Sequence, residues 1–327
     1  MINFDYTKPL SVPAAMNALN KNVSARIIAG GTNLVDLMKR GVMSPEKLID
    51  ITALPLKSIE KKGNSISIGA GALNSTVAEN VLIKKHFPLL TLALQAGASP
   101  QIRNMATVGG NLMQRTRCPY FYDITLPCNK RQPSSGCSAL KGYNRMHAIF
   151  GASENCIAVH PSDMCVAMAA LDATVLVSSV KGNRRILFTD FHKLPGNSPE
   201  KDNNLMQGEI ITAVEIPLQS NLEQRSHYTK IRDRSSYAFA LVSVAAAMHL
   251  DGKTIRTIRL AMGGVAHKPW RLTVAESYLT GREATTENFR NAANIVVKEA
   301  QGYGHNNFKL KLAPNTILET LQILAAK

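Results

Sequence analysis

The sequence is poor in acidic and aromatic residues. Among its 327 residues, 23 are Asp or Glu and 38 are Lys or Arg, which gives a formal net charge of +15. The longest basic runs are pairs such as Lys61 and Lys62, so a disordered nucleic-acid-binding arm is not expected. Aromatic residues make up 6% of the chain, too few for an extended base-stacking surface. The positive surplus instead points to an anionic partner or cofactor.

Long apolar runs are also missing. The longest, 238–248, is interrupted by Ser243 and is much shorter than the roughly 18–20 residues that span a bilayer. The N-terminus has neither a basic leader nor an apolar run of about seven residues, so we expect no secretory signal on this chain. At roughly 100–200 residues per domain, the length predicts about two domains.

Two standard nucleotide-binding signatures are absent, because the chain has no G-x-x-x-x-G-K-[ST] and no G-x-G-x-x-G that opens a helix. Two other loops, Ala29–Leu34 and Thr107–Asn111, each combine paired glycines with Thr and Asn. Backbone amides in such loops bind phosphate, and two loops fit the two phosphates of one dinucleotide. A Gly-Gly pair also marks an ordinary tight turn, so the residues alone leave both interpretations open.

The apolar patterns predict an α+β fold that is interrupted by an irregular insert. Residues 113–161 lack periodicity and are rich in Pro and Gly, and so long a loop needs something to hold it together. A polar stretch at 219–226 suggests a first domain at 1–223, with parts at about 1–57 and 58–223, and a second at 224–327. The expected strands are 25–28, 47–51, 65–69, 210–217 and 255–262, the segment 237–250 suits either a strand or a helix, and the expected helices are 34–40, one from about 75, 89–96, 274–279, 286–300 and 317–326.

All five cysteines lie within 48 residues, and four of them (Cys118, Cys128, Cys137 and Cys156) belong to the insert. There is no C-x-x-C, so spacing alone does not name a metal. Zinc, an iron–sulfur cluster or disulfides would each stabilise a loop without its own core. The fifth, Cys165, lies in an apolar helical run and is expected to be a core residue.

The charge of the insert favours a bound cluster among these alternatives. Between Arg115 and Arg145 there are six basic residues and one acid, Asp123, a local net charge of +5. A tetrathiolate iron–sulfur cluster is anionic and suits such a loop better than a pair of disulfides does. His147 and His160 lie close in sequence, but four cysteines already complete the usual coordination.

Four ordered motifs give the chain a specific resemblance. They are IIAGGTNLVDLMK, AGASPQIRNMATVGGNL, HPSDM and YTKIRDRSSYAFALVSVAA. Together they resemble the FAD-binding subunits of the xanthine dehydrogenase and molybdenum hydroxylase family over nearly the whole chain. The cysteine-bearing insert makes the sequence most similar to the flavoprotein subunits of bacterial periplasmic aromatic aldehyde oxidoreductases.

This resemblance implies roles for individual residues. The first loop would wrap the FAD pyrophosphate, and the second would contact the other phosphate and the ribityl chain. Asp163 would lie near the adenosine part and Lys230 near the isoalloxazine ring, where a cation favours the reduced flavin. Without the family, Asp163 is explained equally well as a helix cap, and Lys230 would be interpreted as a solvated surface lysine. The residues thus assigned to FAD are Ala29, Gly30, Gly31, Thr32, Asn33, Leu34, Thr107, Gly109, Gly110, Asn111, Asp163 and Lys230, and those assigned to a four-iron four-sulfur (4Fe-4S) cluster are Cys118, Cys128, Cys137 and Cys156.

The resemblance also implies a fold, an activity and partners. The fold is a two-part FAD-binding domain of the vanillyl-alcohol-oxidase type with an iron–sulfur insert, followed by a smaller α+β domain. The chain would be the electron-transfer subunit of a heterotrimeric aldehyde oxidoreductase, with molybdopterin on a large subunit and 2Fe-2S clusters on a small one. Electrons would go to oxygen or another acceptor, and no catalytic acid, base or nucleophile is expected here. A partner's twin-arginine signal would carry the complex to the periplasm; otherwise it is cytoplasmic.

Two other functions stay open on the residues alone. A zinc- or cluster-stabilised nucleic-acid-binding protein fits the charge and the cysteines, but it requires a basic face with interleaved aromatics. A stand-alone flavin oxidoreductase fits the glycine loops, but it requires a catalytic base, and none accompanies the motifs.

Overall fold

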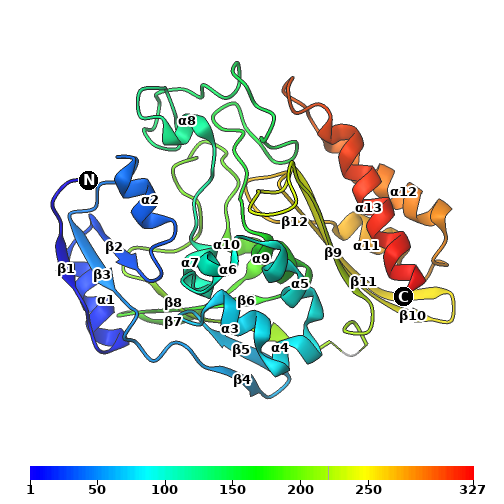
Figure 1. Ribbon diagram of the computed structural model, residues 1–327, viewed down its shortest axis with the longest axis horizontal. Helices are drawn as coiled ribbons and strands as arrows, with labels where there is room; N and C mark the ends of the chain where they lie inside the picture. Colours follow the sequence, from blue (N-terminus) through cyan, green and yellow to red (C-terminus); the bar gives the residue numbers. More distant parts are fainter. Residues whose placement is uncertain (220) are drawn as a thin grey trace.

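The computed structural model describes residues 1–219 and 221–327, which form three β-sheets (Figure 1). The N-terminal sheet is parallel, in the order β1 (Asp5–Thr7), β3 (Lys47–Asp50), β2 (Ala25–Ile28). Helix α1 (Val12–Lys21) packs Ala15 and Leu19 on this sheet, and Ser11 caps the helix by accepting a hydrogen bond from the Ala14 amide. Helix α2 (Leu34–Lys39) follows β2 directly.

The middle of the chain forms an antiparallel sheet that packs against a layer of short helices. Alternating apolar residues such as Ile66, Ile68 and Val214 enter the main core from this sheet. The strand order is β4 (Ile59–Lys62), β5 (Ser65–Gly69), β8 (Ile210–Pro217), β6 (Thr174–Ser179), β7 (Gly182–Leu187). The helices are α3 (Asn74–Glu79), α4 (Val81–His86), α5 (Pro88–Ala96), α6 (Pro100–Arg103), α7 (Val108–Leu112), α9 (Asp163–Ala170) and α10 (Phe188–Phe191).

A third, antiparallel sheet and the last helices form the C-terminal domain around a separate core. The sheet order is β12 (Trp270–Arg271), β11 (Thr254–Gly263), β10 (Val242–Asp251), β9 (Ser226–Ile231), so the ambiguous segment 237–250 is mainly a strand. The helices are α11 (Thr273–Leu279), α12 (Thr286–Val296) with a 3₁₀ turn at Val297–Glu299, and α13 (Lys309–Ala326). The expected start at 317 is wrong, because Pro314 lies inside α13 rather than before it.

The insert contains a single short helix, α8 (Pro119–Tyr122), and no helix or strand is present between it and α9 in the described chain. Polar contacts with the C-terminal domain hold it in place. Arg145 pairs with Asp233 at 2.9 Å, and the Asn144 side chain donates to the Tyr303 carbonyl at 2.7 Å. Figure 1 shows the insert at the top of the molecule, beside the N-terminal end of α13.

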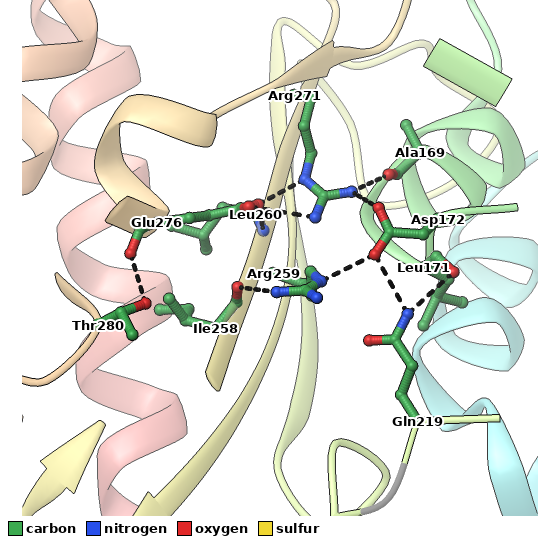
Figure 2. Close-up of polar contacts among 10 residues, drawn as sticks. All are labelled: Ala169, Leu171, Asp172, Gln219, Ile258, Arg259, Leu260, Arg271, Glu276 and Thr280. Atoms are coloured by element: carbon green, nitrogen blue, oxygen red, sulfur yellow. Dashed lines mark hydrogen bonds and ion pairs between the residues drawn. The ribbon is translucent and has the colours of Figure 1, made fainter. Parts of the chain in front are cut away.

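An ionic network joins the end of α9 to the C-terminal domain (Figure 2). The Asp172 carboxylate accepts from Arg259 Nε at 2.9 Å and from Arg271 Nη1 at 2.7 Å. Gln219 Nε2 donates to the same carboxylate at 3.2 Å, and Arg271 also pairs with Glu276. Helix α9 is therefore anchored to β11 and β12. No helix of the described residues is long and apolar enough to cross a membrane.

Candidate functional site

The first glycine loop has the geometry of an anion-binding nest. It connects β2 to α2, and Gly31 adopts φ +70°, a conformation that glycine allows without strain. Its amides point to no protein acceptor: within the described chain no backbone hydrogen bond is donated by the N–H groups of Gly30, Gly31, Thr32, Asn33 or Leu34. Successive unpaired amides before a helix bind phosphate oxygens.

The second glycine loop is built differently. The amides of Val108 and Gly109 donate to the carbonyls of Ala72 and Ala70 at 2.9 and 2.8 Å. The Gly110 amide donates to Thr107 Oγ1 at 3.1 Å, and the Asn111 amide donates to the Thr107 carbonyl. The expectation that these amides also cradle a phosphate is therefore wrong. What this loop offers a ligand is side chains, and the assignment of Thr107, Gly109, Gly110 and Asn111 to FAD stays a prediction.

The two loops nevertheless lie against each other. A Cβ built on Gly30 would lie 1.8 Å from the carbonyl oxygen of Met105, just before the second loop. Asn33 Oδ1 accepts a hydrogen bond from the Arg115 amide at 2.9 Å, just after that loop. Two segments more than 70 residues apart thus form one continuous surface, as binding one dinucleotide requires.

Asp163 and Lys230 form a buried ion pair across the domain boundary. Lys230 Nζ lies 2.8 Å from Asp163 Oδ2, and the two side chains are only 4% and 8% exposed. Lys230 Nζ also donates to the Ala96 carbonyl at 3.0 Å. The surface-lysine interpretation of Lys230 is therefore wrong. The two residues contact each other directly, and their assignment to the adenosine part and the isoalloxazine ring of FAD stays a prediction.

Tyr228 completes this polar cluster, and the sequence analysis missed it. Its hydroxyl donates to Asp163 Oδ1 at 2.7 Å and lies 3.0 Å from Ser243 Oγ. Burial and the Asp163 charge raise the pKa of Tyr228 well above its ordinary value, so the phenol stays protonated. The sequence spacing could have indicated Tyr228, because Tyr228 and Lys230 are two residues apart and therefore share one face of β9.

The four cysteines of the insert line a single cavity. Cys128 and Cys137 are paired by an antiparallel bridge, and Cys118 and Cys156 reach the cavity from other parts of the insert. None of them forms a disulfide in the part of the chain that the structure describes. Cys165 is fully buried in the main core and does not line this cavity, as expected. A loop without its own core that gathers four thiols has a donor set that suits a tetrahedral metal or a cluster.

The electrostatics of this cavity disfavour bare thiolates at Cys118 and Cys156. Burial raises the pKa of Cys118 to about 12. A hydrogen bond between the side chains of Cys137 and Cys156 lowers the pKa of the first and raises that of the second. A metal supplies the positive charge that stabilises such buried thiolates.

The positive charge of the insert is largely used in ion pairs. Lys130 Nζ and Arg115 Nε lie 2.5 and 2.6 Å from the carboxylate of Asp202. Arg117 pairs with Asp36, and Arg145 pairs with Asp233. Acids from outside the insert neutralise much of the local net charge of +5. That charge is therefore not available to balance the negative charge of a cluster.

A second cavity adjoins the cysteine cavity and shares Thr116 and Cys118 with it. Asp163 and Ser162 line its far side, and Gly263 and Gly264 contribute from the C-terminal domain. His147 also lines it, with Nε2 3.1 Å from Cys118 Sγ. His160 lines it as well and lies beside His192, with ring centroids 4.3 Å apart. Cys118 of the cysteine site and Asp163 of the buried ion pair thus line the same cavity.

Both parts of the chain match known families. Residues 2–219 match the FAD-binding domain in molybdopterin dehydrogenase, and residues 226–323 match the CO dehydrogenase flavoprotein C-terminal domain. The chain belongs to the FAD-binding medium subunits of the xanthine dehydrogenase and CO dehydrogenase family, and FAD is its cofactor.

Individual relatives are subunits of oxidoreductases. The chain is 45% identical to the aldehyde oxidoreductase FAD-binding subunit PaoB of Escherichia coli (strain K12), over 97% of each chain. It is 29% identical to the glyceraldehyde dehydrogenase medium chain of Sulfolobus acidocaldarius, over 90% of this chain and 86% of that one. A structure of carbon monoxide dehydrogenase from Hydrogenophaga pseudoflava superposes with a TM-score of 0.78 at 24% identity, covering 100% of this chain and 99% of that one. The predicted α+β fold is confirmed.

Proposed function

We propose that this chain is the electron-transfer subunit of a heterotrimeric molybdenum-containing aldehyde oxidoreductase and that it binds a 4Fe-4S cluster besides FAD. The similarity to an aldehyde oxidoreductase subunit over 97% of both chains supports the substrate class. The main support for the cluster is the single cavity that four free cysteines line.

FAD supplies the capacity to take up two electrons and release them to a different acceptor. The residues of this chain bind and orient it. The unpaired amides of Gly30–Leu34 would hold its pyrophosphate, with Ala29 at the start of the loop. Thr107 and Asn111 would contribute side chains, and the Asp163–Lys230 pair would fix one end of the site.

The proposed partners rest on the relatives, whose names describe them as subunits or medium chains of oxidoreductases. A molybdopterin-binding large subunit would oxidise the aldehyde, and a small subunit with 2Fe-2S clusters would connect it to the FAD. Oxygen or another acceptor would take the electrons finally. We place the complex in the periplasm, carried by a partner's signal. Co-purification with two partners and cell fractionation with and without that signal test these assignments.

Metal analysis of the purified chain tests the cluster directly. We expect about four iron atoms and four acid-labile sulfides per chain, as the cluster requires. Stoichiometric zinc without iron, or a chain with no metal, would refute the cluster. FAD content is measured on the same sample, so the two cofactors are judged separately.

A further inference from the structure

Lys309 is a buried lysine without an acidic partner in the described chain. It is the first residue of α13 and is 0% exposed. Its Nζ donates to the carbonyls of His147 at 3.0 Å and Gly264 at 2.7 Å. In the part of the chain that the structure describes, no carboxylate forms an ion pair with it. Burial, and then the like charge of Arg145, lower the pKa of Lys309 to about 7. Burying an unpaired ammonium is costly, so a nearby anion is needed to keep this side chain charged.

The position of Lys309 indicates which anion that is. The two carbonyls that it binds belong to His147 and Gly264, which both line the cavity beside Cys118. The side chain of His147 lies 3.1 Å from Cys118 Sγ. His147 therefore contacts both Lys309 and the cysteine site. The basic residues of the insert are mostly paired with acids, as described above, whereas the charge of Lys309 is not.

Hydrogen bonding alone does not account for a lysine here. Asn306 is also 0% exposed, and its Nδ2 donates to the same His147 carbonyl at 3.3 Å and to the Ala148 carbonyl at 2.9 Å. A neutral side chain thus already ties α13 to this segment. What Lys309 adds is positive charge in a medium of low dielectric constant, where charges act over longer distances than in water.

We propose that Lys309 is the buried countercharge of the cluster held by Cys118, Cys128, Cys137 and Cys156, and that it raises the reduction potential of that cluster. The inference rests on the proposed function. Reduction adds one electron to the site and leaves every bond of Lys309 intact, so a fixed positive charge favours the reduced, more negative form. Lys309 is a positioning residue, since it contacts no ligand of the cluster.

A redox titration monitored by electron paramagnetic resonance tests this on the full purified chain. We compare the wild type with Lys309→Gln and Lys309→Met, which remove the charge, and with Lys309→Arg, which keeps it. Asn306→Leu is the matched control, because it removes hydrogen bonds to the same backbone without changing charge. Iron content and the flavin potential are measured on each sample.

We expect Lys309→Gln and Lys309→Met to retain iron but to be reduced at a lower potential than the wild type. Lys309→Arg and Asn306→Leu should keep the wild-type potential, even if Asn306→Leu unfolds more easily. An unchanged potential in the neutral variants, or an equal shift in Asn306→Leu, would overturn the proposal and leave the proposed function intact. If Lys309→Met does not fold, Lys309→Gln, which keeps N–H donors, gives the answer. An iron-free wild type would contradict both.

Discussion

The Asp163 carboxylate and the Lys230 ammonium meet 2.8 Å apart in the interior, at the junction of the two domains. Asp163 starts α9 in the FAD-binding domain, and Lys230 lies on β9 of the C-terminal domain. Removal of one partner leaves the other charge buried and unpaired. We expect Asp163→Asn to lower the free energy of unfolding by about 3–5 kcal/mol in urea titrations, with a loss of bound FAD.

An exposed pair provides the control for this prediction. Asp251 and Arg256 are 2.7 Å apart, but both side chains are 61% exposed. Surface pairs contribute about 0–1 kcal/mol, so Asp251→Asn should unfold nearly as the wild type does. Equal losses for the two variants would contradict the role assigned to the buried pair.

The contact between the two glycine loops predicts a specific effect on FAD. In Gly30→Ala, the new Cβ meets the Met105 carbonyl oxygen, which is backbone and cannot rotate away. The loops must separate, and we expect FAD affinity to fall at least tenfold, about 1.4 kcal/mol. Flavin fluorescence titration of the apoprotein measures this.

Gly63→Ala is the matched control for the glycine prediction. Gly63 adopts φ +57° in a turn, where an added Cβ meets no atom within 4 Å. Alanine strains that turn and costs about 1 kcal/mol of stability, but FAD affinity should not change. A comparable loss of FAD in both variants would show that the Gly30–Met105 contact is not part of the binding surface.

The cysteine assignment predicts a contrast between two buried thiols. Cys128 lines the four-cysteine cavity, whereas Cys165 is packed in the main core. Cys128→Ser should lose most of the iron, because serine is a poor ligand for a cluster. Cys165→Ser should keep the iron while losing some stability, since it buries a hydroxyl among apolar side chains. Full iron in Cys128→Ser would refute the ligand assignment.

The lowered pKa of Asp202 predicts that the stability of the fold depends on pH. Burial alone would raise the pKa of Asp202, but Lys130 and Arg115 beside it lower that pKa from 3.8 to about 2. Since the folded-state pKa is the lower one, the stabilisation is complete above the unfolded pKa and is lost as the pH falls toward 2. The contribution lost is about 2 kcal/mol.

Asp202→Asn isolates this contribution from other acidic groups. Urea titrations of the wild type and the variant are compared between about pH 5 and pH 2, the range set by the two pKa values. The difference between their unfolding free energies should shrink by about 2 kcal/mol as the pH falls. A difference that is constant over this range would contradict the depressed pKa.

Local patterns in the sequence predicted much of the fold and singled out the four cysteines that the structure brings together. Strands 25–28, 65–69 and 210–217 have the bounds predicted for them, because alternation and flanking glycines define short strands well. Their position in the irregular insert distinguished four cysteines from Cys165, and the structure brings those four to one cavity.

Contacts between distant segments could not be predicted in this way. The sequence placed the countercharge in the insert, but acids such as Asp202 and Asp36, far along the chain, pair with that charge. Lys309 was outside every predicted element, because the last helix was predicted to begin at 317, whereas α13 begins at Lys309. The composition of the second glycine loop resembled the first, but its amides bond to residues 70 and 72. Such pairings depend on tertiary structure, which no local pattern encodes.

The central claim is that this FAD-binding chain carries its own iron–sulfur cluster in the four-cysteine cavity. The electron paramagnetic resonance spectrum of the dithionite-reduced chain, purified without its partners, tests this most directly. We predict the signal of a reduced 4Fe-4S cluster in the wild type and in Cys165→Ser, and its loss in Cys128→Ser. A reduced wild-type chain that contains FAD but gives no cluster signal and no iron would contradict the account.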